Sequence, residues 1–395
     1  MEKWNHLPDE LLLHIFRFLK EVDLISASCS CRKWRRVFHD ASLWRVRCFE
    51  FSGYYRSQAQ RMQHRLSGYL TAMGKHLQHV HIACSSPNLI TAYNVAQGVK
   101  FLLFGLTDLP NGSWTLQTFT LRHLNFDESW DSFRGSKYVL VTSLSHFFQA
   151  QAALRAIDLK NAFITPPFSN RLLRCVSNSR CRVTVTSLNL VNFFSCDTPS
   201  RYVDIHLMTV FRKCWNLSEI SMNYMYLHAI GVKRLCEALS DTLQLLRLNF
   251  YVLDQTRGDL IRTADWSSAR VTCSRLKVSI HIHCWPREPS SVLVASLPLY
   301  EIMVKGRQCW RSPINLSTKL NRLLDCLSRS YAQTLESASF SAIGVSKFSP
   351  PSHETLTLFL LRCTHLRKLV FSDSLMTPSF MANAKGQLAV DMRTP

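Results

Sequence analysis

One spacing pattern recurs through most of this chain: two apolar residues three positions apart, followed by a third two positions later. In the form L-x-x-L-x-L, with aliphatic or aromatic substitutes, it gives ten units with first residues at 77, 116, 154, 185, 217, 243, 276, 299, 335 and 366. The steps are irregular, from 23 residues (276 to 299) to 39 residues (77 to 116). Alternating apolar residues of this kind predict short strands with one buried face.

Amphipathic stretches long enough for helices lie between the predicted strands, over residues 60–75, 136–151, 201–214, 232–239, 318–330 and 354–363. A strand and a helix cannot bury their apolar faces within one unit, so neighbouring units must stack. The pattern therefore predicts an α/β leucine-rich-repeat solenoid, right-handed, with parallel strands on one side and helices outside. An ordinary α/β domain remains the alternative, because this spacing also arises in other leucine-rich sequences.

The first 47 residues instead have the pattern of several short helices. Pro8 suits the first position of a helix, and the acids that follow it favour the positive end of the helix dipole. Apolar residues then recur at positions 12, 15, 16 and 19 and form one stripe. We expect Asp23 to cap a second helix, Trp34 and Val37 to lie on a third, and Asp40 to precede a last turn. So small a piece needs a partner or a neighbour to be stable.

Four motifs in this segment resemble the F-box from end to end. They are Leu7-Pro8-Asp9-Glu10-Leu11-Leu12-Leu13-His14-Ile15-Phe16-Arg17-Phe18-Leu19, then Asp23-Leu24, then Cys31-Arg32-Lys33-Trp34-Arg35, then Ser42-Leu43-Trp44-Arg45. The loose repeats that follow are typical of F-box proteins whose target-binding domains are leucine-rich solenoids. We therefore expect an α+β chain: a small all-α F-box module followed by an α/β leucine-rich-repeat solenoid.

The resemblance implies binding to the Skp adaptor and, through it, to a cullin scaffold and a RING subunit. The residues that it assigns to the adaptor-binding face or its supporting core are Leu7, Pro8, Leu11, Leu12, Ile15, Phe16, Leu24, Trp34, Leu43 and Trp44. One place departs from the family, which usually has two large aliphatic residues before Cys31. This chain has Cys29 and Ser30, preceded by Ala27 and Ser28. We expect the smaller side chains to cost about 1–3 kcal/mol of burial, at roughly 25 cal/mol per Å², and to weaken adaptor binding.

Side chains that alternate with the buried residues of each predicted strand would form an open surface for a target protein. We expect it to include Thr118, Arg122, Asp158, Lys160, Asn189, Glu219, Asn223, Arg247, Asn249, Lys277, His281 and His283, with Thr120, Ser187, Ser221 and Ser279 beside them. The set is polar with a mild basic bias, which suits hydrogen bonding to a protein segment. Only a minority of such residues is expected to dominate the binding energy.

Basic residues outnumber acidic ones, with 47 Lys and Arg against 27 Asp and Glu and a formal net charge of +20. Such a charge favours an anionic partner, either nucleic acid or an acidic protein surface. The one dense cluster, Cys31 to Arg36, contains the tryptophan that the F-box resemblance assigns to a core. A scattered surface excess is thus the simpler interpretation, and nucleic acid is not the favoured partner. A hydrophobic content of 47% excludes a mainly disordered chain.

The sequence contains no G-x-G-x-x-G, Walker A or G-x-S-x-G motif and no C-x-x-C pair. Nucleotide chemistry, a nucleophile elbow and a zinc site are therefore not indicated, and we expect no cofactor, no metal and no catalytic residue. His281, His283 and Cys284, like His76 and its neighbours at 79 and 81, are interpreted as surface residues. No apolar run approaches the roughly 20 residues that cross a bilayer, and residues 101–106 suit a fragment of a buried helix.

The first residues lack the pattern of a secretory signal. We therefore expect a protein of the cytoplasm or nucleus with reduced cysteines and no membrane partner. The chain is predicted to divide into an F-box module (1–50), a linker helix (51–75), the solenoid (76–375) and a poorly ordered tail (376–395).

These inferences predict a non-catalytic substrate-recognition subunit of a Skp, cullin and F-box ubiquitin ligase. It would bring a bound target protein close to the ubiquitin-charged conjugating enzyme, and its mechanism would be proximity. Two alternatives stay open: an F-box scaffold that acts outside a ligase, and a basic solenoid that binds nucleic acid.

Overall fold

The structure is a computed structural model. It describes residues 7–19, 21–51, 56–84, 92–109, 115–122, 124, 126, 133–195, 200–227, 229–251, 261–284, 289, 292–307, 316–343 and 351–371. The chain forms two compact units, unit 1 with residues 1–185 and 193–196 and unit 2 with residues 186–192 and 197–395. No helix in these ranges combines the length and the apolar character that a bilayer span requires.

Unit 1 begins with a bundle of short helices: α2 (Asp9–Phe16), α3 (Glu21–Ser28), α4 (Arg32–Phe38) and the 3₁₀ turn η1 (Ala41–Leu43). The turn is capped as predicted, because Asp40 Oδ1 accepts a hydrogen bond from the Ser42 N–H at 2.8 Å. The prediction that Asp23 caps the second helix is wrong. α3 begins two residues earlier, at Glu21, and Asp23 lies in its first turn, where a negative charge is still favourable.

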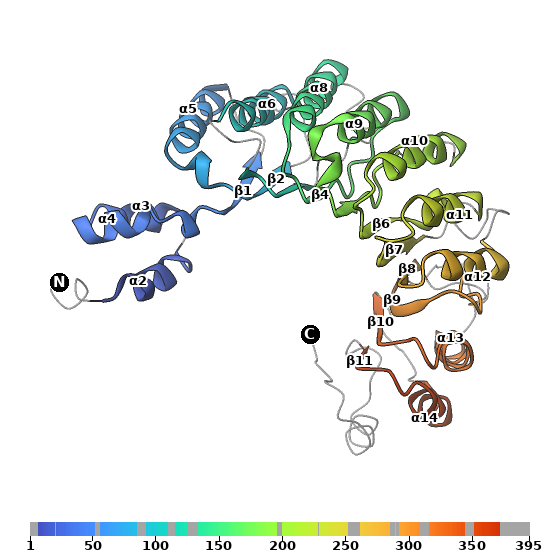
Figure 1. The fold of residues 1–395 in the computed structure, drawn as a ribbon. Coiled ribbons are helices and arrows are strands. Elements are labelled where there is room, and N and C mark those ends of the chain that lie inside the picture. The colour runs from blue at the N-terminus through green and yellow to red at the C-terminus, as the bar shows by residue number, and fades with distance from the viewer. Residues whose placement is uncertain are drawn as a thin grey trace. The chain divides into compact units, whose positions relative to one another are not determined.

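Strands and helices then alternate through the rest of unit 1 (Figure 1). The strands are β1 (Val46–Phe51), β2 (His79–Cys84), β3 (Thr118–Arg122) and β4 (Ala156–Asp158), and the helices are α5 (Arg56–Met73), α6 (Ala92–Asp108), α8 (Arg134–Ala150) and α9 (Pro166–Asn178), with 3₁₀ turns η2 (Gly74–His76) and η4 (Arg180–Val183). The strands pair in chain order, and each of these pairs is parallel. α5, α6, α8 and α9 pack side by side on one face of the strands.

Unit 2 has the same plan. Its strands are β5 (Ser187–Asn189), β6 (Glu219–Asn223), β7 (Leu245–Phe250), β8 (Lys277–Cys284), β9 (Leu299–Arg307), β10 (Ser337–Ile343) and β11 (Lys368–Phe371), and its helices are α10 (Ser200–Lys213), α11 (Ala229–Ala238), α12 (Thr263–Thr272), α13 (Leu316–Ser330) and α14 (His353–Arg362), with the 3₁₀ turn η5 (Tyr224–Tyr226). These strands also pair in chain order and in parallel. The register of β8 with β9 shifts twice.

Aligned apolar side chains hold the strands of each unit together. In unit 1 the register sets Val80 beside Phe119 and Phe119 beside Ile157, all at most 1% exposed. In unit 2 it sets Ile220 beside Leu246, and the same row continues through β8. These residues are the middle position of the L-x-x-L-x-L pattern. The strands that were predicted from it are present as β2 to β11, which confirms the α/β repeat fold behind an all-α start.

The structure also contains elements that the pattern does not indicate. The stretch 101–106, interpreted as a fragment of a buried helix, lies within a helix of 17 residues, α6, whose full length was not predicted. Helices α9 and α12 were not predicted. Strand β1 was not predicted either, because its buried residues Phe49 and Phe51 are not part of an L-x-x-L-x-L unit that begins with leucine. Parallel pairing thus begins at Val46, and α5 joins β1 to β2. The tail predicted over 376–395 lies outside the described residues.

A glycine allows close packing in the first repeat. A Cβ atom added at Gly98 on α6 would lie 2.9 Å from both Cδ1 and Cε1 of Phe51, which is 1% exposed. Real Cβ atoms do not approach a neighbour this closely, so the phenyl ring would have to shift. Gly68 on α5 differs, because a Cβ added there meets no heavy atom within 4 Å.

We expect Gly98→Ala to lower the free energy of unfolding by about 1–3 kcal/mol, because overpacking outweighs the gain in helix propensity. Gly68→Ala is the matched control and should raise it by roughly 0.5–1 kcal/mol, since only propensity changes. Urea titrations of the two variants would measure both effects. An unfolding midpoint that rises equally in both would show that α6 and β1 do not pack as described.

Candidate functional sites: a helical face and a polar strand face

The helical bundle has a small core of its own, extended by one residue from α5. Its buried members are Leu12, Phe16, Leu24, Ala27, Val37, Trp44 and Met73. The Trp44 indole N–H donates a hydrogen bond to the Phe38 carbonyl at 2.6 Å, and the Phe38 and Trp44 rings meet edge to face at 4.9 Å. Four of the predicted adaptor-binding residues, Leu12, Phe16, Leu24 and Trp44, therefore support the module from inside.

The other predicted residues of the module lie nearer the surface. Leu7, Trp34 and Leu43 are half-buried, and Pro8 is exposed. Leu11 and Ile15 are 50% and 36% exposed. Sequence reasoning missed Phe18, which is 76% exposed and lies in the turn directly after α2, where its N–H donates to the Ile15 carbonyl at 3.0 Å. We call Leu11 and Ile15 on α2, together with Phe18 just beyond its end, the exposed apolar row of α2.

Ion pairs join the first helix to the third. Asp9 Oδ2 accepts a hydrogen bond from Arg36 Nη2 at 2.7 Å, and Asp9 Oδ1 lies 3.7 Å from Lys33 Nζ. Lys33 Nζ also donates to the Leu7 carbonyl. Two members of the basic cluster 31–36 are thus engaged within the module.

The departure from the F-box pattern affects the core at two positions. Ala27 and Ser28 are buried, and the Ser28 hydroxyl donates to the Ile25 carbonyl at 2.6 Å. Cys29 and Ser30 are exposed. The expected loss of burial therefore falls on Ala27 and Ser28, and its effect on adaptor binding stays a prediction.

The strand face of unit 1 carries few free polar groups. His79 Nδ1 and Thr118 Oγ1 lie within hydrogen-bond distance, 2.8 Å apart. Asp158 Oδ1 accepts from the Lys160 N–H at 3.0 Å and closes the turn after β4. Arg122 and Lys160 are exposed, whereas Thr120 is 7% exposed. Of the predicted target-binding residues here, the two basic ones are the most accessible.

Asparagines tie together the carboxyl ends of strands in unit 2. Asn223 Oδ1 accepts from the Asn192 N–H at 2.8 Å, and Asn223 Nδ2 donates to Asn192 Oδ1 at 2.8 Å. Asn249 Oδ1 lies 2.8 Å from His283 Nε2, and the His283 ring stacks on Tyr251 with centroids 4.4 Å apart. Asn223 and Asn249 are each 4% exposed. Both are therefore structural, which corrects the prediction that they face a target.

A polar cluster surrounds Glu301 on β9. Glu301 Oε2 accepts hydrogen bonds from the Ser279 hydroxyl at 2.7 Å and the Tyr300 hydroxyl at 3.3 Å, and it lies 4.0 Å from His281 Nε2. The His281 imidazole, followed by the Ser279 hydroxyl, lowers the pKa of the Glu301 carboxyl to about 2, against the opposing effect of its burial. Sequence reasoning chose His281 and the serine but missed Glu301, although its place next to the apolar positions 302 and 304 of the predicted strand could have indicated an outward-facing side chain.

Two further ion pairs cross the strand face of unit 2. Arg247 Nη1 lies 3.2 Å from Glu219 Oε2, and Lys277 Nζ donates to Glu336 Oε1 at 2.6 Å. Lys277 also lowers the pKa of the Glu336 carboxyl, more than does Arg367 at 4.0 Å. Asn189 Oδ1 accepts from the Val191 N–H at 3.2 Å. The predicted residues Glu219, Arg247, Lys277 and His281 therefore lie in one charged surface on neighbouring strands, which we call the unit 2 charged face.

Within the described ranges, no three His, Cys, Asp or Glu side chains gather in a way that could hold a metal ion. His281 approaches one carboxylate, and the His283 ring is engaged by Asn249 and Tyr251. His81 lies on β2, where burial lowers the pKa of its imidazole.

The pKa of the Glu301 carboxyl is about 2 in the folded protein and 4.5 ordinarily, so its ionised form should stabilise unit 2 fully at pH values above 4.5. This stabilisation should be lost as the pH falls from 4.5 toward 2. We expect Glu301→Gln to lower the free energy of unfolding near neutral pH by roughly 1–3 kcal/mol. The difference from wild type should shrink as the pH falls through this window. Urea unfolding at a series of pH values would measure it, with the exposed Glu354→Gln as control. A difference that does not change with pH would contradict the assignment.

Comparison with known proteins matches both parts of the chain. A family model described as F-box-like matches residues 4–50. F-box/LRR-repeat protein 21 of Bos taurus is 24% identical over 274 residues, which cover 67% of this chain and 56% of the relative. The Mus musculus protein of that name is 24% identical over 294 residues, covering 72% and 61%. This chain thus spans about three fifths of the length of these relatives. Together with the helical bundle and the parallel strand repeats, these matches show an F-box-like module followed by a repeat domain, the arrangement named in the F-box/LRR-repeat proteins that the chain is similar to.

Proposed function

We propose that this protein is the substrate-recognition subunit of a Skp, cullin and F-box ubiquitin ligase. The observation that carries the proposal is the exposed apolar row of α2, Leu11, Ile15 and Phe18, on a module that an F-box-like model matches. Apolar side chains at i and i+4 on an exposed helix, extended by Phe18 in the turn that follows, suit a helix-in-groove interface. Its partner in this proposal is the Skp adaptor, through which a cullin and a RING subunit are reached.

Target binding is assigned to the strand face of the repeats. The unit 2 charged face offers Arg247, Lys277 and His281 beside three glutamates. Such a surface recognises a protein segment by charge and hydrogen bonding, and the contacts with desolvated groups are expected to contribute most.

The mechanism in this proposal is proximity. A target held on the repeats has its lysines close to a conjugating enzyme that carries ubiquitin, and the effective concentration of the two reactants rises. No acid, base or nucleophile from this chain is required, so its role is non-catalytic. The cytoplasm and the nucleus are the compartments in which we expect it to act.

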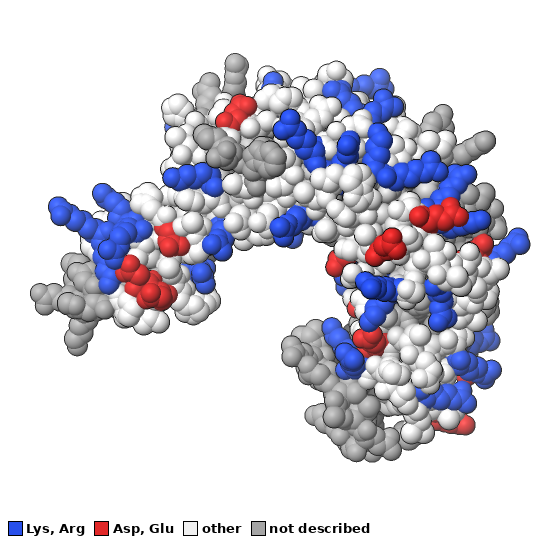
Figure 2. Space-filling view, viewed as in Figure 1, with Lys and Arg blue, Asp and Glu red and all other residues white. Residues whose placement is uncertain are grey.

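A basic surface in unit 1 favours a second candidate, binding to nucleic acid. Residues 133–185 contain eight Lys and Arg but a single acid, Asp158. Figure 2 shows Lys and Arg side chains gathered over α8 and α9. Arg174, Arg180 and Arg182 are exposed. Affinity for a nucleic acid that falls steeply with added salt would favour this function, and an affinity independent of salt would remove it.

We expect the double variant Leu11→Asp/Ile15→Asp to lose about 100-fold or more in affinity for the Skp adaptor, because charges replace an apolar row that is buried only in the complex. Calorimetric titration of the full chain with the adaptor would measure the loss. Leu361→Asp, a change of a more accessible leucine on α14 (70% exposed), is the control and should bind as wild type. Equal affinities of the double variant and the control would contradict the assignment.

The same pair of variants tests the ligase in cells. Purification of wild type should recover the adaptor, the cullin and target proteins, whereas Leu11→Asp/Ile15→Asp should retain targets and lose the other two. Recovery of the adaptor without the cullin by wild type would favour a scaffold that acts outside a ligase.

A further inference from the structure

β1 presents an open backbone edge at the start of the repeats. It is first in the strand order and pairs with β2 through the register Val46↔His79 to Phe51↔Cys84. The Arg45 carbonyl accepts hydrogen bonds from the N–H groups of Gln78 at 2.9 Å and His79 at 2.8 Å. Because the backbone groups of successive residues point to alternate edges of a strand, those of Val46 and Cys48 point away from β2. No strand in the described ranges pairs with that edge.

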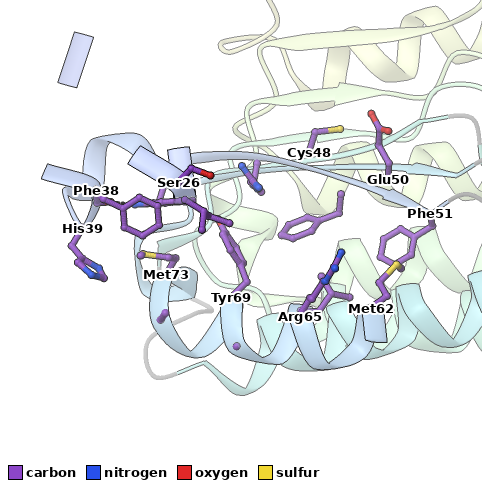
Figure 3. Close-up of a pocket in the computed structure, with 17 residues that line it drawn as sticks. Ser26, Phe38, His39, Cys48, Glu50, Phe51, Met62, Arg65, Tyr69 and Met73 are labelled. Atoms are coloured by element: carbon purple, nitrogen blue, oxygen red, sulfur yellow. Dashed lines mark hydrogen bonds between the residues drawn. The ribbon is translucent and has the colours of Figure 1, made fainter. Parts of the chain in front are cut away.

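A groove with a volume of about 750 Å³ follows this edge. It lies between β1, α5 and the ends of α3 and α4, and apolar side chains form most of its wall (Figure 3). Ile25 is 48% exposed there, and Phe49, Leu66 and Met73 lie deeper. An apolar groove beside an unpaired strand edge offers main-chain hydrogen bonds and a pocket for alternate side chains together, which is what an added strand requires.

The α5 side of the groove is positively charged. The Arg47 guanidinium lies over the rings of Trp44 and Tyr69, 5.8 Å and 5.2 Å from their centroids, and Arg65 on α5 is exposed. Glu50 is the one acid among the described lining residues, and Figure 3 shows it directed away from α5. An acidic side chain is therefore the electrostatically matched guest on the α5 side.

We propose that the outer edge of β1 binds an extended acidic segment of a partner protein, which adds to the sheet as a further strand. Two of its side chains, two positions apart, point to the α5 side, where an apolar one packs against Phe49 and Leu66 and an acidic one pairs with Arg47. This site is separate from the apolar row of α2 and from the unit 2 charged face, and it does not depend on the proposed ligase function.

The test uses a labelled ten-residue peptide in which every second residue is threonine. The remaining positions are occupied in turn by valine and aspartate. We expect the full chain to bind it in fluorescence anisotropy titrations, and a peptide with lysine in place of aspartate to bind at least tenfold more weakly. Cys48→Pro removes only an N–H that points away from β2, a change that edge strands tolerate. It should lower the affinity at least tenfold, whereas Cys48→Ala, which keeps the N–H, should bind as wild type.

A second pair of variants does not depend on how well β1 accepts proline. Gly68 lines the groove, and a side chain there meets no neighbour within 4 Å. Gly68→Glu should weaken binding of the aspartate peptide relative to Gly68→Gln, which has the same size without the charge. Equal binding of the aspartate and lysine peptides, or equal binding by Cys48→Pro and Cys48→Ala, would overturn the proposal. Self-association of the chain without peptide would also overturn the proposal if Cys48→Pro abolished that self-association. A second copy of the chain would then be the occupant of the β1 edge.

Discussion

The burial of one aligned row of aliphatic side chains across parallel strands is the interaction on which both units depend. Single strands are very short, and β4 and β5 have three residues each. Fixing such a strand costs about 1–2 kcal/mol of backbone entropy per residue, and burying its one central side chain gains about 1.5–3 kcal/mol. A single repeat is therefore unstable, and stability arises from stacking on both neighbours.

This dependence explains which elements the sequence predicts. The central row must be apolar in every repeat, so a search for it finds β2 to β11 even where the steps between repeats vary. β1 needs no leucine because its Phe49 and Phe51 pack on α5 and α6 instead. Helix α12 is mostly polar, with Trp266 and Ala269 as its buried residues, so its periodicity is weak. These elements are determined by contacts with neighbours that the local pattern does not contain.

The sites follow the same rule. Leu11, Leu12, Ile15 and Phe16 are all apolar, and a spacing argument alone does not separate the inner pair from the outer pair. Leu12 and Phe16 lie inside because the bundle packs on that side, which leaves Leu11 and Ile15 outside. Likewise, Asn223 and Asn249 have the alternation of surface residues, but Asn223 hydrogen-bonds Asn192 in the turn after β5 and Asn249 lies within hydrogen-bond distance of His283 on β8. Polarity in a strand predicts a hydrogen bond, and only the structure identifies the partner.

The contribution of Met73 to the core of the helical bundle limits how freely this architecture can be rearranged. Met73 comes from α5 and is 4% exposed in that core, and the Tyr69 ring on the same helix contacts Trp44 at 5.8 Å and Phe49 at 5.7 Å. A gene fragment that stops before α5 would encode an incomplete hydrophobic interior. Domain shuffling that moves this bundle to another protein would therefore have to carry the first repeat helix with it, and the genetic boundary of the domain would lie after residue 73 rather than at its last bundle helix.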